Sequence, residues 1–432
     1  MIHLVRLGTH AEKEYLIKAY AWYDEVTINA NLLEATSAAT SFFLLGAAAH
    51  GRGFIIDPVT YAFALDPTYV LSGSPRSRPR RPKSTFASLG QKYGAPIDSN
   101  VGQRPISPQE FTPDVVASFA EAVLRYQADT VTHTLHANVD YLDEEPETPI
   151  QPSRLIAPYF YYDGDPEWLR VNGELARAAV GMSARFGLQV WPLLCFDSML
   201  LDYREDIAAL ADAFTDINCP GYFLWATAFD ETRATAGQID GLRHLASRLC
   251  GTPGRPLLNM YGGYFSLLLK EHHMDGVSHG IGYGERRDVI PVTGGGMPPA
   301  RYYLPAIHDE ISIDDLFRLA AGMANDEFLH TICGCTICAH LIRSGGVQFL
   351  LDQFGATVRK LVQDTYRDVP APSVFKLTKF HFLDARHQEV QSLQSVPLGT
   401  LVHRLSEAHD RFALQLGPQR LSYLRVWHRA LT

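Results

Sequence analysis

Three cysteines within six residues are the strongest chemical signal in the chain. They lie in the segment Cys333–Cys338 (CGCTIC). Thiolates at this spacing can wrap one Zn²⁺ ion when a turn lies between them, and Gly334 supplies the backbone freedom for that turn. A fourth ligand must come from elsewhere, and His340, His381 and His387 follow in the same part of the chain. Three thiolates and one imidazole leave no open position for water, so the pattern predicts a structural zinc; three incidental thiols are the alternative.

Acidic residues at the ends of apolar runs are the second set that could do chemistry. Asp57 ends GFIID, Asp197 follows LQVWPLLCF, Asp230 follows GYFLWATAF, and Glu285 lies in GVSHGIGYGERRD. Carboxylates gathered at one place can trap a cationic centre or move protons. Simpler interpretations are a turn that starts at Asp57 before a proline, and a solvated, ion-paired charge at Glu285.

The elements that must position these residues alternate between short apolar runs and longer segments of helical periodicity. Near-continuous apolar strands between amphipathic helices are typical of a parallel sheet with a covered outer face. Eight such units predict an α/β fold, a closed (β/α)₈ TIM-like barrel whose carboxyl strand ends gather the active residues. An open doubly wound sheet is the alternative. The strand candidates are 25–30, 53–57, 155–161, 188–196, 221–228, 256–262, 276–283 and 302–307.

The predicted barrel fills residues 1–324, and a mainly helical, zinc-binding subdomain fills residues 325–432. A basic insertion near residues 74–92 interrupts the barrel pattern. Its first part, SPRSRPRRPK, combines cations with prolines, which predicts an exposed arm rather than a helix. Such cations can neutralise phosphates without reading sequence, although a merely solubilising arm is the alternative. The residues concerned are Arg76, Arg78, Arg80, Arg81 and Lys83.

The composition of the 432 residues narrows the class of protein. Hydrophobic residues make up 46% and charged residues 20%, as in a folded globule. The net charge of −9 excludes a uniformly basic nucleic-acid coat. No long apolar run predicts a membrane span, the N-terminus does not resemble a signal peptide, and the six cysteines form no disulfide framework. We therefore expect a cytoplasmic protein with no membrane partner.

A barrel followed by C-x-C-x₂-C and a later histidine resembles the tRNA-guanine transglycosylase family. The second strand of that family ends in an Asp that opens an aromatic-containing loop (D-S-G-G-F/Y-Q), and Asp57 followed by Tyr61 in IIDPVTYAF is similar. The first strand of the family carries an Asn near its end, as VTINANLL does. Its fifth strand ends in Gly-Glu, where this chain has Asp230-Glu231. The resemblance covers roughly residues 25–390.

The chain departs from the family pattern at two places. Pro-Val-Thr at residues 58–60 replaces Ser-Gly-Gly, and Ile281 occupies the position of the nucleophilic Asp in the strand-seven motif. The segments IDPVTYAFALDP and STFASLGQKYG look more like the bacterial branch that inserts 7-deazaguanine bases into DNA. The activity implied by this resemblance is that of a pentosyltransferase, which exchanges guanine in DNA for a 7-deazaguanine such as preQ0 and needs no organic cofactor.

The resemblance also implies roles for the candidate residues. Base exchange passes through an oxocarbenium-like centre, so Asp57 and Glu285 are the expected catalytic carboxylates, with Glu285 as the nucleophile candidate. The base needs proton acceptors and a stacking surface. The residues expected to bind it are Asp197, Asp230, Tyr159 and His279. By comparison with the family's Leu-Thr-x-His-Asn pattern, His381 in LTKFHFLDAR is the expected fourth zinc ligand, and His387 is the second choice.

Other functions remain open at this stage. The same exchange on tRNA is the nearest alternative, and a non-catalytic nucleic-acid-binding subunit is favoured by the missing strand-seven Asp. An unrelated metal-dependent hydrolase would need an open metal site, which the cysteines do not leave. The expected partners are DNA, from which the target base must be extruded, a free 7-deazaguanine base, and a DNA-acting ATPase implied by the resemblance.

Overall fold

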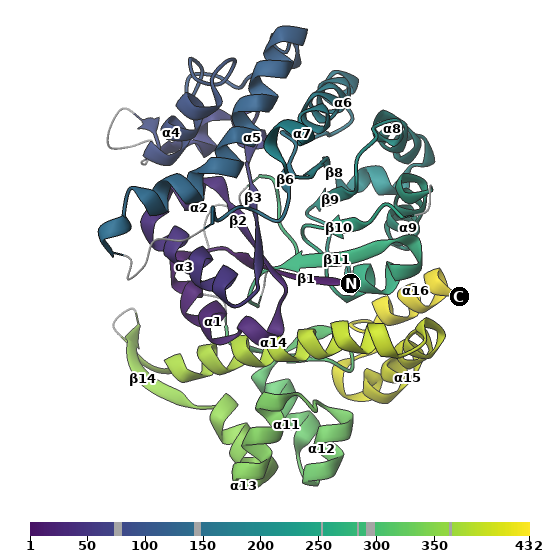
Figure 1. Ribbon diagram of the computed structural model, residues 1–432. Helices are drawn as coiled ribbons and strands as arrows, with labels where there is room; N and C mark the ends of the chain where they lie inside the picture. The colour runs from purple at the N-terminus through teal and green to yellow at the C-terminus, as the bar shows by residue number, and fades with distance from the viewer. Residues whose placement is uncertain (73–79, 142–147, 252–253, 283–284, 291–298, 363–364) are drawn as a thin grey trace.

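The structure, a computed structural model, describes residues 1–72, 80–141, 148–251, 254–282, 285–290, 299–362 and 365–432. Its centre is a curled sheet of seven parallel strands in the order β3-β2-β1-β11-β10-β9-β8, with helices around it (Figure 1). The strands are β1 (Ile2–Leu7), β2 (Glu25–Asn29), β3 (Gly53–Asp57), β8 (Leu193–Asp197), β9 (Tyr222–Thr227), β10 (Leu257–Asn259) and β11 (Met274–His279). The α/β class and the parallel sheet predicted from the sequence are confirmed.

The strands are apolar because both faces of the sheet are covered. Every residue of β2 and of β9 is buried, with alternate side chains directed to opposite faces. A polar residue in such a strand needs a partner, and Glu25 at the start of β2 pairs with Arg154 at 2.5 Å. Asn29 and Asp57 are register partners at the carboxyl ends of β2 and β3, so the ends of these strands present polar side chains side by side.

Helices connect successive strands and pack around the sheet (Figure 1). Neighbouring helices contact one another in chain order, α3 with α5, α5 with α6, α6 with α8 and α8 with α9. Each helix returns the chain so that the next strand runs parallel to the last. The helices of this part are α1 (Lys13–Lys18), α2 (Ala30–Ala35), α3 (Ser37–Ala49), α4 (Ser84–Tyr93), α5 (Pro113–His136), α6 (Pro166–Gly181), α7 (Ser183–Phe186), α8 (Arg204–Thr215), α9 (Ala236–Cys250) and α10 (Tyr264–Leu268).

The N-terminal segment is a strand that the sequence pattern did not reveal. β1 lies between β2 and β11, with Leu4 opposite Glu25 and Ile2 opposite Gly276. The polar residues His3 and Arg6 hide its apolar character in the sequence. Asp57 therefore ends the third strand of the chain and not the second.

The predicted strand 302–307 is wrong as a member of the central sheet. β12 (Arg301–Leu304) instead pairs antiparallel with β13 (Asp309–Ser312), outside that sheet. Its apolar residues face a different neighbour, because Tyr302 and Tyr303 pack against His381 and Phe382 of α14 (Pro372–Ser395). An apolar run indicates burial but does not say against which element.

The predicted strands 155–161 and 188–196 are shorter than expected. β6 (Leu155–Ile156) pairs in parallel with β7 (Val190–Trp191), and β7 is separated from β8 by Pro192 alone. Proline has no N–H to donate, which explains the interruption between β7 and β8. On the other side of β6, the Ser153 N–H donates to the Phe54 carbonyl in β3 at 2.8 Å.

The C-terminal part of the chain returns to the sheet. α14 (Pro372–Ser395) packs against the strands, with the Phe382 ring 5.1 Å from the His279 ring of β11. α16 (Ser422–Leu431) contacts α9, and Trp427 Nε1 donates to the Glu231 carbonyl at 3.0 Å. The remaining elements are α11 (Ile313–Ala320), α12 (Asn325–Thr331), α13 (Thr336–Phe354), β14 (Thr357–Val362), β15 (Thr365–Pro370) and α15 (Leu398–Leu416). None of the helices described is both long and apolar enough to span a membrane.

Two histidines are buried together between the sheet and α14. His3 Nε2 and His279 Nε2 lie 2.7 Å apart, so one ring donates and the other accepts. Burial, together with the charge of Arg386, lowers the pKa of His279 to about 3. Burial and then His279 lower the pKa of His3 well below its usual value. Both rings are therefore neutral in the folded protein, whereas the unfolded chain takes up protons below pH 6.5.

This pair predicts a loss of stability in mild acid. Each histidine contributes stability that is present above pH 6.5 and is lost as the pH falls toward its folded pKa. Between pH 7.5 and 5.0 we expect the free energy of unfolding to fall by about 2 kcal/mol per histidine. His279→Gln should lose about 2 kcal/mol less over this interval, and the exposed His403→Gln should behave like the wild type. Urea unfolding at both pH values measures the difference, and equal losses in all three proteins would contradict the assignment.

Candidate functional site

Three cysteines and one histidine meet in a buried cluster. Cys333, Cys335, Cys338 and His381 are all buried, and their ligand atoms lie within 4.8 Å of one another. His381 Nδ1 lies 3.3 Å from Cys335 Sγ and 3.5 Å from Cys338 Sγ. Tetrahedral Zn²⁺ with Zn–S bonds of about 2.3 Å places its sulfur ligands about 3.8 Å apart. The four atoms therefore fit one metal ion such as zinc.

Local backbone geometry holds the three sulfurs in place. Cys333 follows α12, and Cys335 is the residue that caps α13. The Cys335 N–H donates to Cys333 Sγ, and the Cys338 N–H donates to Cys335 Sγ, both at 3.4 Å. Backbone donors stabilise the thiolate, which is the form of cysteine that binds a metal.

His381 rather than His387 completes the cluster. His381 Nε2 lies 2.7 Å from the Tyr303 carbonyl, and a hydrogen bond there leaves Nδ1 to face the sulfurs. His387 lies on the same helix but on another side, with its ring 6.3 Å from that of His3, and His340 is exposed on α13. The β14–β15 hairpin lies between α13 and α14, which accounts for the long spacing between Cys338 and His381.

Asp57 is fully buried at the carboxyl end of β3. Its Oδ1 accepts hydrogen bonds from Tyr159 Oη at 2.7 Å and from the Val59 N–H at 3.0 Å. Burial raises the pKa of Asp57, and the Tyr159 hydrogen bond and the charge of Arg287 work against this rise. The structure thus brings together two residues expected in the active site, Asp57 and Tyr159.

Aromatic rings and a guanidinium group surround this carboxyl group. The Tyr61 ring stacks 5.7 Å from the Tyr159 ring and meets Trp225 edge-on at 5.0 Å. Trp225 lies 4.6 Å from Tyr261, and Arg287 Nη1 donates to Tyr261 Oη at 2.8 Å. We call the residues Asp57, Tyr61, Tyr159, Trp225, Tyr261 and Arg287 the Asp57 site. It combines a buried acid, flat apolar surfaces and a positive charge.

Glu285 lies in a different pocket, which we call the Glu285 pocket. This pocket of about 780 Å³ lies beyond the carboxyl ends of β9 and β10, and its lining includes Asp230, Tyr264, Glu285, Arg286, His308 and Glu310. Burial raises the pKa of Glu285 to about 8, and Arg386 counteracts this rise while Glu231 adds to it. The charged neighbours of Asp57 are Arg6 and Arg287, so the two carboxyl groups have separate electrostatic environments.

A fully buried arginine lies below the Glu285 pocket. Arg386 on α14 is completely buried and donates to Glu285, and its Nη1 lies 3.2 Å from Glu389. Glu389 also accepts from Tyr303 Oη at 2.9 Å and contacts His308 Nδ1 at 2.6 Å. The carboxylates and Tyr303 hold the pKa of Arg386 above its usual value despite burial. This cluster joins α14 to the chain that follows β11.

The other residues expected to bind substrate lie apart from Asp57. Asp197 ends β8, accepts from Tyr161 Oη at 2.7 Å and caps the following turn at Met199. Asp230 pairs with Arg286 in the Glu285 pocket. His279 is buried against His3 and faces α14, where its low pKa makes proton transfer near neutral pH unfavourable.

The basic arm is only partly described. Arg76 and Arg78 lie outside the described residues. Arg81 lies in β5 (Arg81–Pro82), which pairs with β4 (Leu71–Ser72), and it is exposed. Arg80 is half-buried, and Lys83 Nζ donates to the Tyr69 carbonyl at 2.8 Å. The residues from Ser84 onward form α4, so the insertion ends in a helix.

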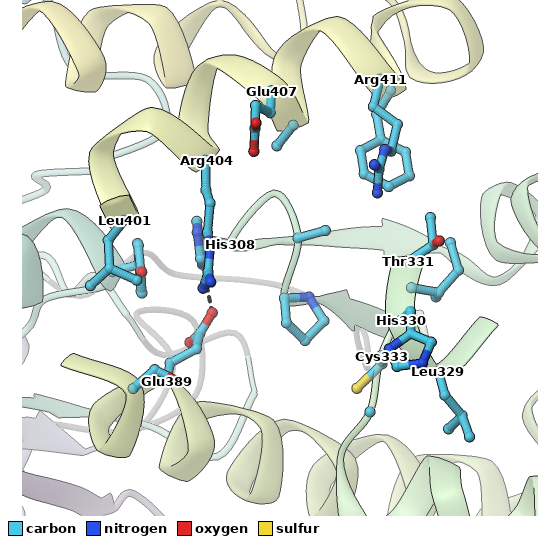
Figure 2. A pocket seen from close by; sticks show the side chains of 18 residues that line it. His308, Leu329, His330, Thr331, Cys333, Glu389, Leu401, Arg404, Glu407 and Arg411 are labelled. Carbon is cyan, nitrogen blue, oxygen red and sulfur yellow. Dashed lines mark hydrogen bonds and ion pairs between the residues drawn. The ribbon is translucent and has the colours of Figure 1, made fainter. Parts of the chain in front are cut away.

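A second pocket lies between α15 and the segment that leads to the metal cluster (Figure 2). It has a volume of about 500 Å³, and Arg404, Glu407 and Arg411 of α15 line it opposite His330 and Cys333. His308 and Glu389 form part of its floor, where a hydrogen bond joins them (Figure 2). The metal cluster therefore lies directly behind the wall of this pocket.

The sequence did not predict four residues as parts of these sites: Arg6, Trp225, Arg287 and Arg386. Arg6 was hidden in the unrecognised strand β1, and Trp225 looked like an ordinary core residue. Arg287 and Arg386 stand in charged stretches that resemble solvated surface. A signal was present only for Arg287, because it stands in GVSHGIGYGERRD, the segment that already provided Glu285 as a candidate.

No model of a known protein family matches the sequence, and no curated protein matches it.

The metal cluster predicts one zinc ion per chain. Cys335→Ser and His381→Gln should each reduce the zinc content from about one per chain to near zero, because three ligands hold zinc weakly. Both should also lower the midpoint of thermal unfolding, since metal binding is linked to folding. Cys250→Ser is the matched control, because Cys250 is buried but its thiol only donates to the Arg255 carbonyl. Elemental analysis of the purified proteins measures this, and metal-free wild type would refute the site.

The Arg386 cluster predicts a large cost when its cation is removed. Arg386→Met leaves Glu285 and Glu389 without a buried counter-charge, and breaking such a pair costs about 3–5 kcal/mol. Arg404→Met, on the exposed face of α15, should change stability by less than about 0.5 kcal/mol. Urea unfolding at pH 7.5 compares the two, and similar stabilities would show that the buried charges contribute nothing.

Proposed function

We propose that this protein is a transglycosylase that exchanges guanine in DNA for a 7-deazaguanine base such as preQ0. The proposed scaffold is a closed (β/α)₈ barrel. The Ser153–Phe54 hydrogen bond links β6 to β3, and β6 pairs with β7, which continues into β8 after one residue. A parallel contact between Tyr162 and Phe196 lies further along the same edge. These contacts support closure of the seven-stranded sheet through β6 as an eighth strand.

The observation that carries the proposal is the Asp57 site. A fully buried carboxyl group stands at a strand end among tyrosine and tryptophan rings. Aromatic faces suit the stacking of a planar base, and a carboxyl group can exchange protons with its ring N–H and amino groups. Because burial raises its pKa, Asp57 is better able to take up a proton than an exposed carboxylate would be.

Glu285 is the proposed nucleophile. In base exchange its carboxylate oxygen would bond to the sugar C1′ while the bond from C1′ to guanine breaks, and guanine would leave with the bonding electrons and take up a proton from Asp57. The incoming base would then attack C1′ through a ring nitrogen, pass the proton of that nitrogen to the Asp57 carboxylate and release the Glu285 carboxylate. This role requires Glu285 to leave Arg386, and its position after β11, on a segment that also carries Arg287, supports such a movement toward the Asp57 site.

The proposed metal has a structural role and takes no part in base exchange. Three thiolates and one imidazole would hold zinc in a closed tetrahedral shell, which supplies folding energy and no open position for water. The proposed zinc would fix the junction of α12, α13 and α14, and α14 carries Arg386.

DNA is the proposed partner, with Arg80, Arg81 and Lys83 as phosphate contacts. A DNA-acting ATPase is the proposed companion in the cell.

Base exchange can be tested directly with labelled preQ0. We expect incorporation into guanine-containing DNA and a loss of about 100-fold or more in the initial rate for Asp57→Asn. The exposed Asp98→Asn is the matched control and should retain the wild-type rate. Melting curves for each variant exclude a folding defect.

Three outcomes would contradict the proposal in different ways. Incorporation into tRNA alone would reassign the substrate to RNA. Unchanged incorporation by Asp57→Asn would remove Asp57 from the chemistry. No incorporation into either nucleic acid, together with intact binding, would indicate a non-catalytic binding subunit.

A further inference from the structure

Two arginines from distant parts of the chain meet beside Tyr261 of the Asp57 site. Arg6 lies on β1 and Arg287 follows β11, and both are half-buried. The Arg6 guanidinium lies over the Tyr261 ring at 4.7 Å, and Arg287 donates to the hydroxyl of the same tyrosine. With its amide oxygen turned toward Arg287, Asn29 of β2 accepts from Nη1 at 2.5 Å and Nη2 at 3.0 Å.

The two arginines differ in whether their guanidinium N–H groups have hydrogen-bond acceptors. Arg287 is well satisfied by Asn29 and Tyr261. Arg6 is not, since its buried Nη1 has no hydrogen-bond partner among the described residues. A buried donor without an acceptor is costly and rare in folded proteins. A ligand oxygen at this position would supply the missing acceptor.

The local charge points to the chemistry of that ligand. Two guanidinium groups face Asp57, whose own pKa burial raises. Burial lowers the pKa of Arg6, and repulsion from Arg287 lowers it further while Glu12 opposes both. Two half-buried guanidinium groups therefore lie near one fully buried carboxyl group, and Glu12 is a further acid near Arg6. An anion with several oxygen atoms would relieve the repulsion and accept the unused N–H bond.

We propose that Arg6, supported by Arg287, binds a backbone phosphate of the nucleotide whose base enters the Asp57 site. This inference rests on the proposed function, because it takes the ligand to be DNA. A nucleotide brought to Asp57 carries a phosphate on each side of its sugar, and Arg6 lies over the ring of Tyr261 in the same site. Arg6 is thus a substrate-positioning residue and takes no part in bond breaking.

Binding measurements with a modified oligonucleotide test this contact. The probe is a fluorescein-labelled single-stranded DNA with one guanosine, prepared with normal linkages or with a neutral methylphosphonate 5′ or 3′ to that guanosine. We expect Arg6→Gln to weaken binding of the normal probe about tenfold and to reduce the slope of log Kd against log salt by about one. Arg6→Lys should keep the slope, because it keeps the charge.

The decisive result is the combination of the two changes. The wild type should bind one of the two methylphosphonate probes about tenfold more weakly than it binds the normal probe. Arg6→Gln should bind that same methylphosphonate probe as tightly as it binds the normal probe. Arg52→Gln is the matched control, since Arg52 is half-buried at the opposite end of β3 and donates to the Tyr23 carbonyl. It should respond to both probes as the wild type does. Thermal melting confirms that each variant is folded.

The outcomes separate this inference from the proposed activity. The phosphate contact would be overturned if Arg6→Gln and each methylphosphonate reduced the binding affinity by independent factors that multiply. Normal binding by Arg6→Gln would also overturn it, even if base exchange occurs. The same interdependence seen only with an oligoribonucleotide would overturn DNA as the partner. Interdependence on DNA without any preQ0 incorporation would support the contact and refute the transglycosylase. Failure of the wild type to bind either nucleic acid would overturn both.

Discussion

The pairing of β1 with β2 on one side and with β11 on the other is the constraint on which the rest of the structure depends. β1 occupies the middle of the sheet, so it joins the strands from the first fifth of the chain to those that follow residue 190. Without it, the backbone N–H and C=O groups of β2 and β11 would face each other across a gap, and unpaired buried backbone groups are costly. The same pairing aligns the carboxyl ends of the strands at one edge, which is where Arg6, Asn29, Asp57 and Arg287 come together.

A second connection runs through α14. One helix presents His381 to the three cysteines, Arg386 to Glu285 and Glu389, and Phe382 to the outer side of β11. The metal cluster, the buried ion pairs and the sheet are therefore mechanically linked. In the proposed reaction the nucleophile Glu285 contacts α14 at Arg386, five residues after His381 of the metal cluster.

The two carboxyl groups differ in what surrounds them. Asp57 lies among aromatic rings and near two arginines, whereas Glu285 shares its cavity with other carboxylates and one buried arginine. Burial raises the pKa of both, but Asp57 is bonded to Tyr159 among aromatic rings, whereas Glu285 is paired with Arg386. This division of environments is the physical basis for assigning them different roles.

The sequence alone was sufficient for features that depend on local pattern. The runs 25–30 and 53–57 became β2 and β3 because short segments rich in β-branched and aromatic residues favour strands over helices. The spacing of Cys333, Cys335 and Cys338 allows their sulfurs to meet within a single turn, and that local geometry does not depend on the rest of the fold.

Tertiary structure decided what depends on contacts between distant segments. It placed β1 at the centre of the sheet and moved the run at 302–307 out of it, because strand pairing is chosen by the available neighbours and not by apolar character alone. It selected His381 over His387, since both lie on α14 and only the direction of the helix distinguishes them. It buried Arg386 completely and Arg6 and Arg287 in part, because the sequence does not show which distant carboxylates and tyrosines will receive a cation.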